Sequence, residues 1–253
     1  MKLTIAALAA ALTLLAGAAA QAAEVRVLIS GAFKAPMADI KPLFEQATGH
    51  KLVVDADTSG RIAQRIGRGE ETDFIISTSA GIDDLIKSGK VLADSKAAVA
   101  RAGVGVVVRK GAPKPDVSTP DKFKQALLDA KSVAYTNPAS GGQSGVYFAK
   151  LLAQLGIADE INKKAKFGEG GPVAVIVGKG DAEIGMQPIP ELLAHSDVAD
   201  FVAPLPAALQ SYNHLTAGIP SNGKQPDAAR ALIKFLATPA AQAIMKAKGL
   251  EPG

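Results

Sequence analysis

The feature that most constrains the fold is an alternation of apolar strand-like runs with amphipathic helical segments between residues 24 and 87. Strands are expected at Glu24–Ser30, Lys51–Asp55 and Asp73–Ser77. A segment with apolar side chains at helical spacing follows each strand, and Gly49 and Gly89 end the first and third of these helices. Because strands that alternate with helices pair in parallel, the pattern predicts an α/β fold with a parallel-rich sheet flanked by helices.

The alternation continues in a second block, whose first strand, Val104–Val108, is too apolar to lie at a sheet edge. Further strands are expected at 131–136, 182–187, 201–206 and 212–219, and helices at 120–130, 173–177, 191–195, 226–236 and 239–248. The proline-rich connection Lys110–Pro120 indicates entry into a second lobe. We expect lobe 1 to comprise residues 23–103 and 218–253, and lobe 2 residues 104–217. Two α/β lobes joined by two crossings enclose a ligand cleft at the carboxyl ends of their strands.

Residues 1–22 have the pattern of a cleavable secretory signal peptide. Lys2 precedes the alanine-rich apolar run Leu3–Ala20, which ends in small residues suited to cleavage after Ala22. The chain has no cysteine, so it offers no lipid attachment site and no disulfide framework. These features predict a soluble protein exported to the periplasm.

The composition excludes several classes of function. The net charge is only +4 and aromatic residues make up 4% of the chain, so no basic, aromatic-rich surface for nucleic acid is expected. The three histidines, His50, His195 and His214, lie far apart in sequence and no thiol is present. We therefore expect no metal site, no nucleophilic cysteine and no cofactor. A mildly basic exported protein remains compatible with a small anionic ligand.

The stretch Tyr135–Phe148 reads as a strand, a glycine-rich bend and a helix that opens at about Ser144. Free backbone N–H groups and the helix dipole at such an opening favour an anion, with Gln143 and Ser144 beside it. An ordinary capped turn uses the same residue types, and this alternative stays open.

Two other helix entrances have the same character. Asp57–Gly60 leads into a helix with Ser59 at its start and Arg61 in its first turn, and Gly168–Pro172 leads into another with Gly171 beside it. Arg61 could reach a ligand, although with Arg65 it could equally form a solvated helix face.

Several segments, in their order and spacing, resemble those of the periplasmic molybdate-binding protein family. Members of that family are solute-binding receptors of ABC importers. The segments are Val25–Val27, Pro36–Ile40, Thr58–Ile66, Asp73–Ser77, Gly145–Tyr147, Leu155–Gly156, Gly185–Met186, Phe235–Leu236 and Pro239–Gln242. The resemblance covers essentially the whole mature chain and implies a two-lobed periplasmic-binding-protein (type II) fold. It also implies that serine hydroxyls and backbone N–H groups hold an oxyanion, with Ser59 and Ser144 at matching positions.

The chain departs from that family where two hydroxyls are expected. Ala32 replaces a serine, with Ser30 and Gly31 adjacent, and Pro188 replaces a tyrosine. Without these two hydroxyls the site would make fewer hydrogen bonds to molybdate, so we expect molybdate to bind more weakly. The side chains expected near the cleft instead are Lys34, Arg61, Gln143, Gln187 and His214. Cations and amides suit a ligand with several carboxylates.

The segments Gly168–Pro172 and Glu183–Leu192 resemble a divergent branch of the family that includes a periplasmic aconitate isomerase. That resemblance implies a cofactor-free isomerase that moves an allylic proton and therefore needs an acid–base group. The candidates are His214 first, then Glu169, Tyr135, Tyr147 and Tyr212. A structural role for His214 stays open, as does the alternative that the protein is a transport receptor for molybdate, tungstate or an organic anion. A receptor would dock on an ABC permease, and we expect the protein to be a monomer in either role.

Overall fold

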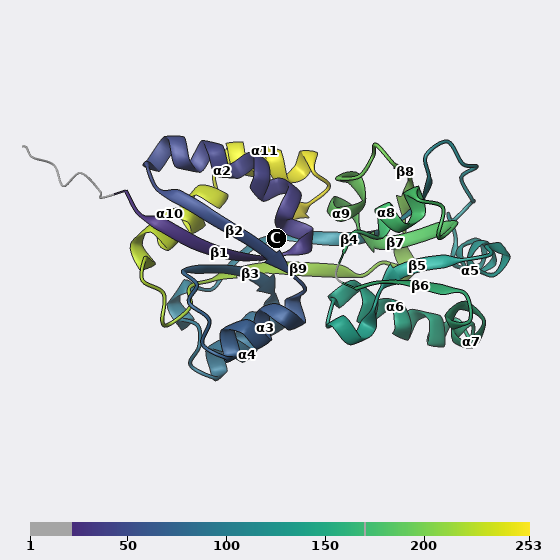
Figure 1. The fold of residues 1–253 in the computed structure, drawn as a ribbon, viewed down its shortest axis with the longest axis horizontal. Coiled ribbons are helices and arrows are strands. Elements are labelled where there is room, and N and C mark those ends of the chain that lie inside the picture. Colours follow the sequence, from purple (N-terminus) through teal and green to yellow (C-terminus); the bar gives the residue numbers. More distant parts are fainter. Residues whose placement is uncertain (1–21, 170) are drawn as a thin grey trace, which may run out of the picture.

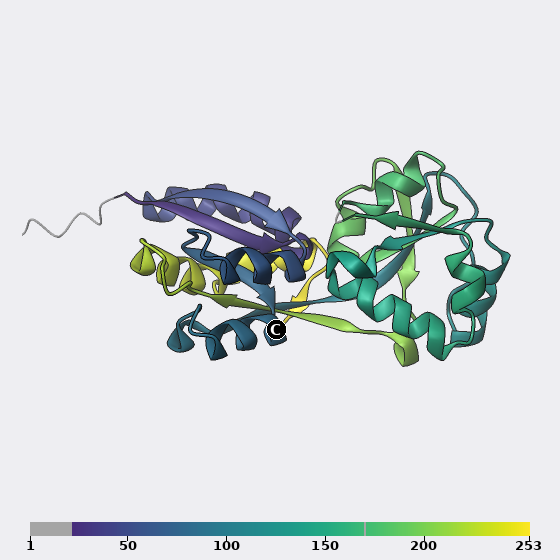
Figure 2. The same ribbon diagram turned by 60° about the horizontal axis from the view of Figure 1, so that its bottom comes forward.

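The computed structural model describes residues 22–169 and 171–253. The chain forms two lobes that lie side by side, and strands β4 (Ala97–Arg109) and β9 (Tyr212–Gly218) run between them (Figures 1 and 2). The predicted signal peptide lies almost wholly in residues 1–21, outside the described residues. Among the residues that are described, no helix is both long and apolar enough to cross a membrane.

The first lobe is built on β1 (Glu24–Ser30), which pairs in parallel with β2 (Lys51–Asp57) and with β3 (Phe74–Thr78). Strand β9 then pairs antiparallel with β3 and with the first half of β4, and β10 (Glu251–Pro252) also pairs with β4. The sheet is flanked by α2 (Lys34–Thr48), α3 (Ser59–Gly67), α4 (Ser79–Lys87), α10 (Pro226–Leu236) and α11 (Pro239–Ala247). Two short 3-10 helices, η1 (Gly31–Phe33) and η2 (Ala93–Ser95), complete the lobe.

Helices cover both faces of the first sheet, and successive side chains of β1 point to opposite faces, so the strand contributes to an apolar cluster on each side. Val27 packs in the cluster that contains Phe44 of α2, whereas Leu28 packs in the cluster that contains Ile62 of α3. This arrangement explains why Val27, Leu28 and Ile29 form a continuous apolar run in the second half of β1.

The second lobe repeats the plan. Strand β5 (Val133–Thr136) pairs in parallel with β6 (Ala165–Gly168) and β7 (Ile184–Pro188), while the second half of β4 pairs antiparallel with β7 and with β8 (Ala199–Pro204). The helices are α5 (Pro120–Asp129), α6 (Gln143–Gln154), α7 (Ala158–Asn162), α8 (Val173–Gly178) and α9 (Ile189–Leu193), with η3 (Pro138–Ser140) and η4 (Ala207–Leu209). Its main core contains Phe123, Tyr135 and Phe148, whose rings pack on one another.

The predicted two-lobed α/β fold is confirmed, with two local differences. The strand predicted to begin at Val104 begins at Ala97, because residues 97–103 pair with β9 before residues 104–109 pair with β7 and β8. The polar stretch 159–166, which is not among the expected helices and strands, contains most of α7 and the start of β6. The lobe boundaries at 103/104 and 217/218 stay predictions.

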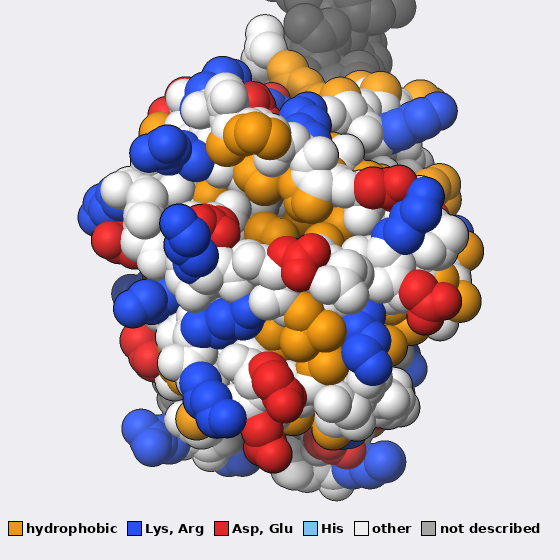
Figure 3. All heavy atoms as spheres, turned by 90° about the vertical axis from the view of Figure 1, so that its right-hand side faces the viewer, with side chains coloured by type: hydrophobic (Ala, Val, Ile, Leu, Met, Phe, Trp, Pro, Cys, Tyr) orange, Lys and Arg blue, Asp and Glu red, His pale blue; other side chains and the backbone are white. Residues whose placement is uncertain are grey.

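Acidic and basic side chains are interspersed over the end of the second lobe, with apolar atoms visible between them (Figure 3). Lys122 and Asp116 form one of the ion pairs of this lobe, at 2.7 Å, and both side chains are more than half exposed. Exposed ion pairs of this kind contribute little to the free energy of unfolding, about 0 to 1 kcal/mol each. Each lobe is therefore stabilised mainly by its own apolar clusters.

Candidate functional site

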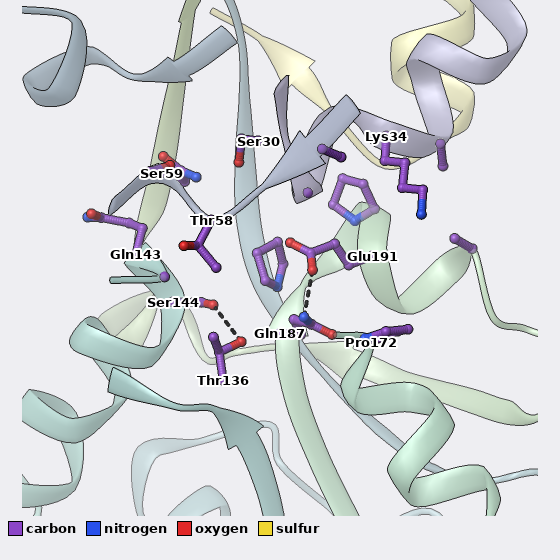
Figure 4. A pocket seen from close by; sticks show the side chains of 18 of the residues that line it. Ser30, Lys34, Thr58, Ser59, Thr136, Gln143, Ser144, Pro172, Gln187 and Glu191 are labelled. Carbon is purple, nitrogen blue, oxygen red and sulfur yellow. Dashed lines mark hydrogen bonds between the residues drawn. The ribbon is translucent and has the colours of Figure 1, made fainter. Parts of the chain in front are cut away.

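A cavity of about 350 Å³ lies between the lobes. The first lobe contributes the end of β1, the start of α2 and the turn from β2 into α3; the second contributes the ends of β5 and β7, the start of α6, and α9 (Figure 4). Loops that follow parallel strands meet here from both lobes, as expected for a ligand site in an α/β protein.

Two helices begin at the cavity, one from each lobe. Thr58 caps α3, since its hydroxyl accepts a hydrogen bond from the backbone N–H of Arg61 at 3.3 Å. Helix α6 begins directly after Gly142 and packs so closely on the end of β5 that a Cβ atom at Gly145 would lie 2.3 Å from the carbonyl oxygen of Thr136. Glycine is therefore required there, and the packing brings Gln143 and Ser144 to the cavity wall.

The lobes touch through backbone at one side of the cavity. The Thr58 hydroxyl donates to the carbonyl of Ser140 at 2.7 Å, and the Gly60 N–H donates to the carbonyl of Gly141 at 3.2 Å. A Cβ atom at Gly60 would lie 2.8 Å from the Cα atom of Gly141, and Gly141 has φ 71°, which favours glycine. We call these four residues, Thr58, Gly60, Ser140 and Gly141, the latch side.

Most of the predicted ligand-binding residues line the cavity. They are Ser30, Gly31, Lys34, Ser59, Gln143, Ser144 and Gln187. The other predicted residues, Arg61, Gly171, His214 and Glu169, are not among the described residues that line it.

Arg61 and its neighbour Arg65 pair with acidic residues of their own lobe. Arg61 lies 3.7 Å from a carboxylate oxygen of Asp57, and its side chain is 46% exposed. Arg65 lies 2.7 Å from Asp55 and 2.6 Å from Glu70, which accounts for its raised pKa: the hydrogen bond to Glu70 is the main cause, opposed by burial. These arginines neutralise carboxylates at the end of β2, which leaves Lys34 as the cation on the cavity wall.

The two predicted acid–base residues are exposed. His214 faces solvent from β9, where it is paired in register with Arg101 of β4. Glu169 follows β6, and its carboxylate accepts hydrogen bonds from the side-chain amide of Asn137 at 2.9 and 3.1 Å.

Glu191, which the sequence reasoning placed on a helix but did not select, lies at the cavity instead. It belongs to α9, and a Cβ atom at Gly31 of the other lobe would lie only 3.4 Å from its carboxyl atoms. Although the residue as a whole is partly exposed, its carboxyl is surrounded by protein, and this burial raises the pKa of Glu191 to about 7. A hydrogen bond from Gln187, at 2.5 Å, acts to lower that pKa and does not outweigh the burial.

The Gln187 amide is held in one orientation. Its oxygen accepts a hydrogen bond from the backbone N–H of Val173 at 2.8 Å, so its nitrogen must face the other way. That nitrogen donates to Glu191 and to the carbonyl of Gly171, the latter at 3.3 Å. We call Gly31, Gln187 and Glu191 the carboxyl side of the cavity; Figure 4 shows Glu191 near its centre.

Within the described residues, no group of three or more His, Cys, Asp or Glu side chains is arranged to hold a metal ion. The polar groups that line the cavity are hydroxyls, amides, backbone N–H groups, Lys34, Asp57, Glu191 and His195.

Comparison with known families identifies the chain. The model of the family described as bacterial extracellular solute-binding protein matches residues 25–251. The chain is a bacterial extracellular solute-binding protein.

This solute-binding protein has two informative relatives in sequence. It is 34% identical over 232 residues to a Pseudomonas protein named aconitate isomerase, covering 89% of this chain and 87% of that one. It is 30% identical over 237 residues to the molybdate-binding protein ModA of Azotobacter vinelandii, covering 91% of each chain.

The fold is shared with solved binding proteins. The Azotobacter vinelandii periplasmic molybdate-binding protein superposes with a TM-score of 0.77 at 20% identity, over 90% of this solute-binding protein and 99% of that structure. The tungstate-binding protein TupA from Desulfovibrio alaskensis superposes with a TM-score of 0.64 at 14% identity, over 92% and 99% of the two chains. These similarities show the fold alone.

Proposed function

We propose that this solute-binding protein is an aconitate isomerase, which converts trans-aconitate to cis-aconitate by an allylic proton shift. The relative named aconitate isomerase supports the proposal through 34% identity along nearly the whole chain. The substrate is a small organic anion with three carboxylates, and the reaction requires a group that accepts and returns a proton.

The observation that carries the proposal is the presence of Lys34 and Glu191 among the ionisable side chains of the cavity wall, which also include Asp57 and His195, beside hydroxyl and amide groups. A receptor that holds an oxyanion by neutral hydrogen bonds needs neither side chain. A tricarboxylate is stabilised by a cation near one carboxylate, and its isomerisation needs a proton-transfer group within reach.

The cavity supports the same reading. Its volume of about 350 Å³ lies at the lower end of the range of pockets that hold small organic ligands. The starts of α3 and α6 approach it from opposite lobes with Ser59, Gln143 and Ser144 beside them, so two ligand carboxylates can each meet backbone N–H groups. Lys34 is placed for the third.

The direct test is to add trans-aconitate to the purified mature protein and follow the appearance of cis-aconitate by proton NMR. We expect catalytic accumulation of the cis isomer until the two isomers reach equilibrium. The control is the same protein after thermal unfolding. A folded protein that binds molybdate tightly and leaves trans-aconitate unchanged would refute the proposal.

A second candidate is a transport receptor for an oxyanion or an organic anion, which the 30% identity to ModA favours. In that role the protein would close on its ligand and dock on an ABC permease. Calorimetric titration with molybdate, tungstate and trans-aconitate separates the two roles, because a molybdate receptor responds to the first two only.

We further propose a periplasmic location, with cleavage after Ala22, on the basis of the leader pattern in residues 1–22. Intact mass measurement on protein released by osmotic shock checks this. A mature species that retains Met1 contradicts it.

A further inference from the structure

We propose that Glu191 is the catalytic residue that carries the substrate proton, and that Gln187 is its positioning residue. The inference rests on the proposed isomerase function and adds to it the identity of the acid–base group.

The first argument is location. Glu191 projects from α9 of the second lobe and lies against Gly31 at the end of β1 in the first lobe, so its carboxyl lies between the lobes. A Cβ atom at position 31 would lie 3.4 Å from both carboxyl oxygens, in ordinary van der Waals contact, so the Glu191 carboxyl lies directly beside the backbone of the other lobe. A ligand enclosed by the two lobes therefore has this carboxyl as a neighbour.

The second argument is orientation. Gln187 donates to Oε2 of Glu191, and the N–H of Val173 fixes which end of the Gln187 amide does so. Oε1 accepts no hydrogen bond from the described residues and remains available to the cavity. One oxygen is thus held while the other is presented, as a group that must meet a carbon-bound proton requires.

The third argument is chemistry. The other ionisable side chains on the cavity wall are Lys34, Asp57 and His195. Asp57 is committed to Arg61 and Arg65, at 3.7 and 3.5 Å. Burial raises the pKa of Glu191 to about 7, so at neutral pH the carboxyl is present in both forms and can accept a proton and return it.

The step balances without a co-reactant. The Glu191 carboxylate removes a proton from the methylene carbon of trans-aconitate, and the C–H electron pair becomes a new C=C bond to the central carbon. The electrons of the former C=C bond are delocalised onto the neighbouring carboxylate. The protonated Glu191 then delivers a proton to the former vinyl carbon, which becomes the methylene carbon of cis-aconitate. No atom is oxidised or reduced, and Glu191 ends as it began.

The main experiment compares the parent with Glu191→Gln, and uses Glu160→Gln, an exposed position on α7, as the matched control. We expect Glu191→Gln to lower the turnover number by at least about a thousandfold. Its affinity for trans-aconitate should be unchanged or tighter, because a negative charge beside a trianion has been removed. Glu160→Gln should behave like the parent in both measurements.

Retained affinity also shows that the variant is folded. If Glu191→Gln does not fold, Glu191→Asp serves instead: it keeps the charge, withdraws the carboxyl by one methylene, and should lose turnover by about a hundredfold.

Gln187 is tested through the pH profile. The Gln187→Glu variant keeps an oxygen that can accept the hydrogen bond from the backbone N–H of Val173. It replaces the amide nitrogen that donates to Glu191 with a carboxylate oxygen, which places a second negative charge beside that carboxyl. The midpoint of kcat/KM against pH should therefore rise by about one unit or more. A purely structural role for Gln187 would lower activity without moving that midpoint.

The outcomes separate the two proposals. If the parent does not isomerise trans-aconitate, the proposed function is wrong and the role of Glu191 falls with it. If the parent is active and Glu191→Gln keeps more than about a tenth of the turnover, the isomerase stands and the assignment is overturned. Loss of turnover in Glu169→Gln or His214→Gln but not in Glu191→Gln would overturn it in favour of that residue.

Discussion

The two sides of the cavity join the lobes in different ways. On the latch side the contact is made largely by backbone: Gly60 and Gly141 approach without side chains, and two hydrogen bonds end on the carbonyls of η3 and of the bend after it. On the carboxyl side the contact is made by the ionisable side chain of Glu191 against Gly31. The latch side contains no titratable side chain, whereas the carboxyl side contains Glu191, whose pKa is raised to about 7.

This difference separates closure from chemistry. Changes on the latch side should alter how well the lobes meet around a ligand, with the same effect at every pH. Changes on the carboxyl side should alter proton transfer and the pH dependence of stability. The predictions below test this separation in order of decreasing effect.

The largest effect is expected from the pH dependence of stability in Glu191→Gln. The pKa of Glu191 is raised from 4.5 to about 7 in the folded protein, so folding favours the protonated form. The associated stability is fully present below pH 4.5, where both states are protonated, and is lost as the pH rises through 7. Glutamine imitates the neutral form, so at pH 8 the variant should be more stable than the parent by on the order of 2 kcal/mol, with little difference near pH 4.

Urea unfolding of the ligand-free protein at pH 4 and pH 8 measures this difference. The same gap at both pH values would show that the carboxyl titrates normally in the folded protein.

The next effect is expected at the latch side. Gly60→Ala places a Cβ atom 2.8 Å from the backbone of Gly141, so the lobes must separate slightly. We expect trans-aconitate to bind about tenfold more weakly, the equivalent of one charge-assisted hydrogen bond at about 1.5 kcal/mol. The same substitution at Gly67, at the other end of α3, meets no atom within 4 Å and is the matched control.

Calorimetry and thermal unfolding of the two variants complete this test. Alanine favours a helix over glycine by up to about 1 kcal/mol, so Gly67→Ala should not lower stability, whereas in Gly60→Ala the close approach to Gly141 opposes that gain. Equal ligand affinities for the two variants would mean that the contact between Gly60 and Gly141 plays no part in closure.

The smallest effect distinguishes the two cations that the sequence placed near the cleft. Lys34 lines the cavity, whereas Arg61 lies 3.7 Å from Asp57 and does not line the described cavity. Lys34→Met should weaken trans-aconitate binding about fivefold at low salt, and Arg61→Met by less than about twofold. Titrations at two salt concentrations provide the measurement, and a larger loss for Arg61→Met would place the ligand nearer α3.

The sequence was most informative where the signal was local. Apolar periodicity located β1, β2 and β3, and glycine, serine and threonine marked the starts of α3 and α6 at the cavity. The first half of β4 was missed because Ala97–Gly103 is rich in alanine and glycine and becomes a strand only through pairing with β9.

Glu191 was not selected for a similar reason. Its segment was read as a helix, but nothing near it in sequence shows that its carboxyl is buried, since part of that burial comes from Gly31 in the other lobe. His214 was preferred because an unperturbed histidine titrates near neutrality, whereas Glu191 reaches that range only through tertiary packing. The available sequence signal for Glu191 was its place in the first turn of a short helix, directly after a strand that ends at the cleft.

The central position of β9 has a consequence for the order in which the chain can fold during synthesis. Strand β9 lies between β3 and β4 in the first sheet, yet it follows every strand of the second lobe in sequence. Until residues 212–218 emerge, β3 has an unpaired edge, and α10 and α11 have not yet covered the sheet. The elements from α5 to β8 are contiguous in the chain and can pack with the second half of β4 earlier. We therefore expect that, in a nascent chain stopped before Tyr212, the second lobe resists proteolysis while the first lobe is still cleaved. This is the reverse of the usual order, in which the N-terminal domain folds first during synthesis.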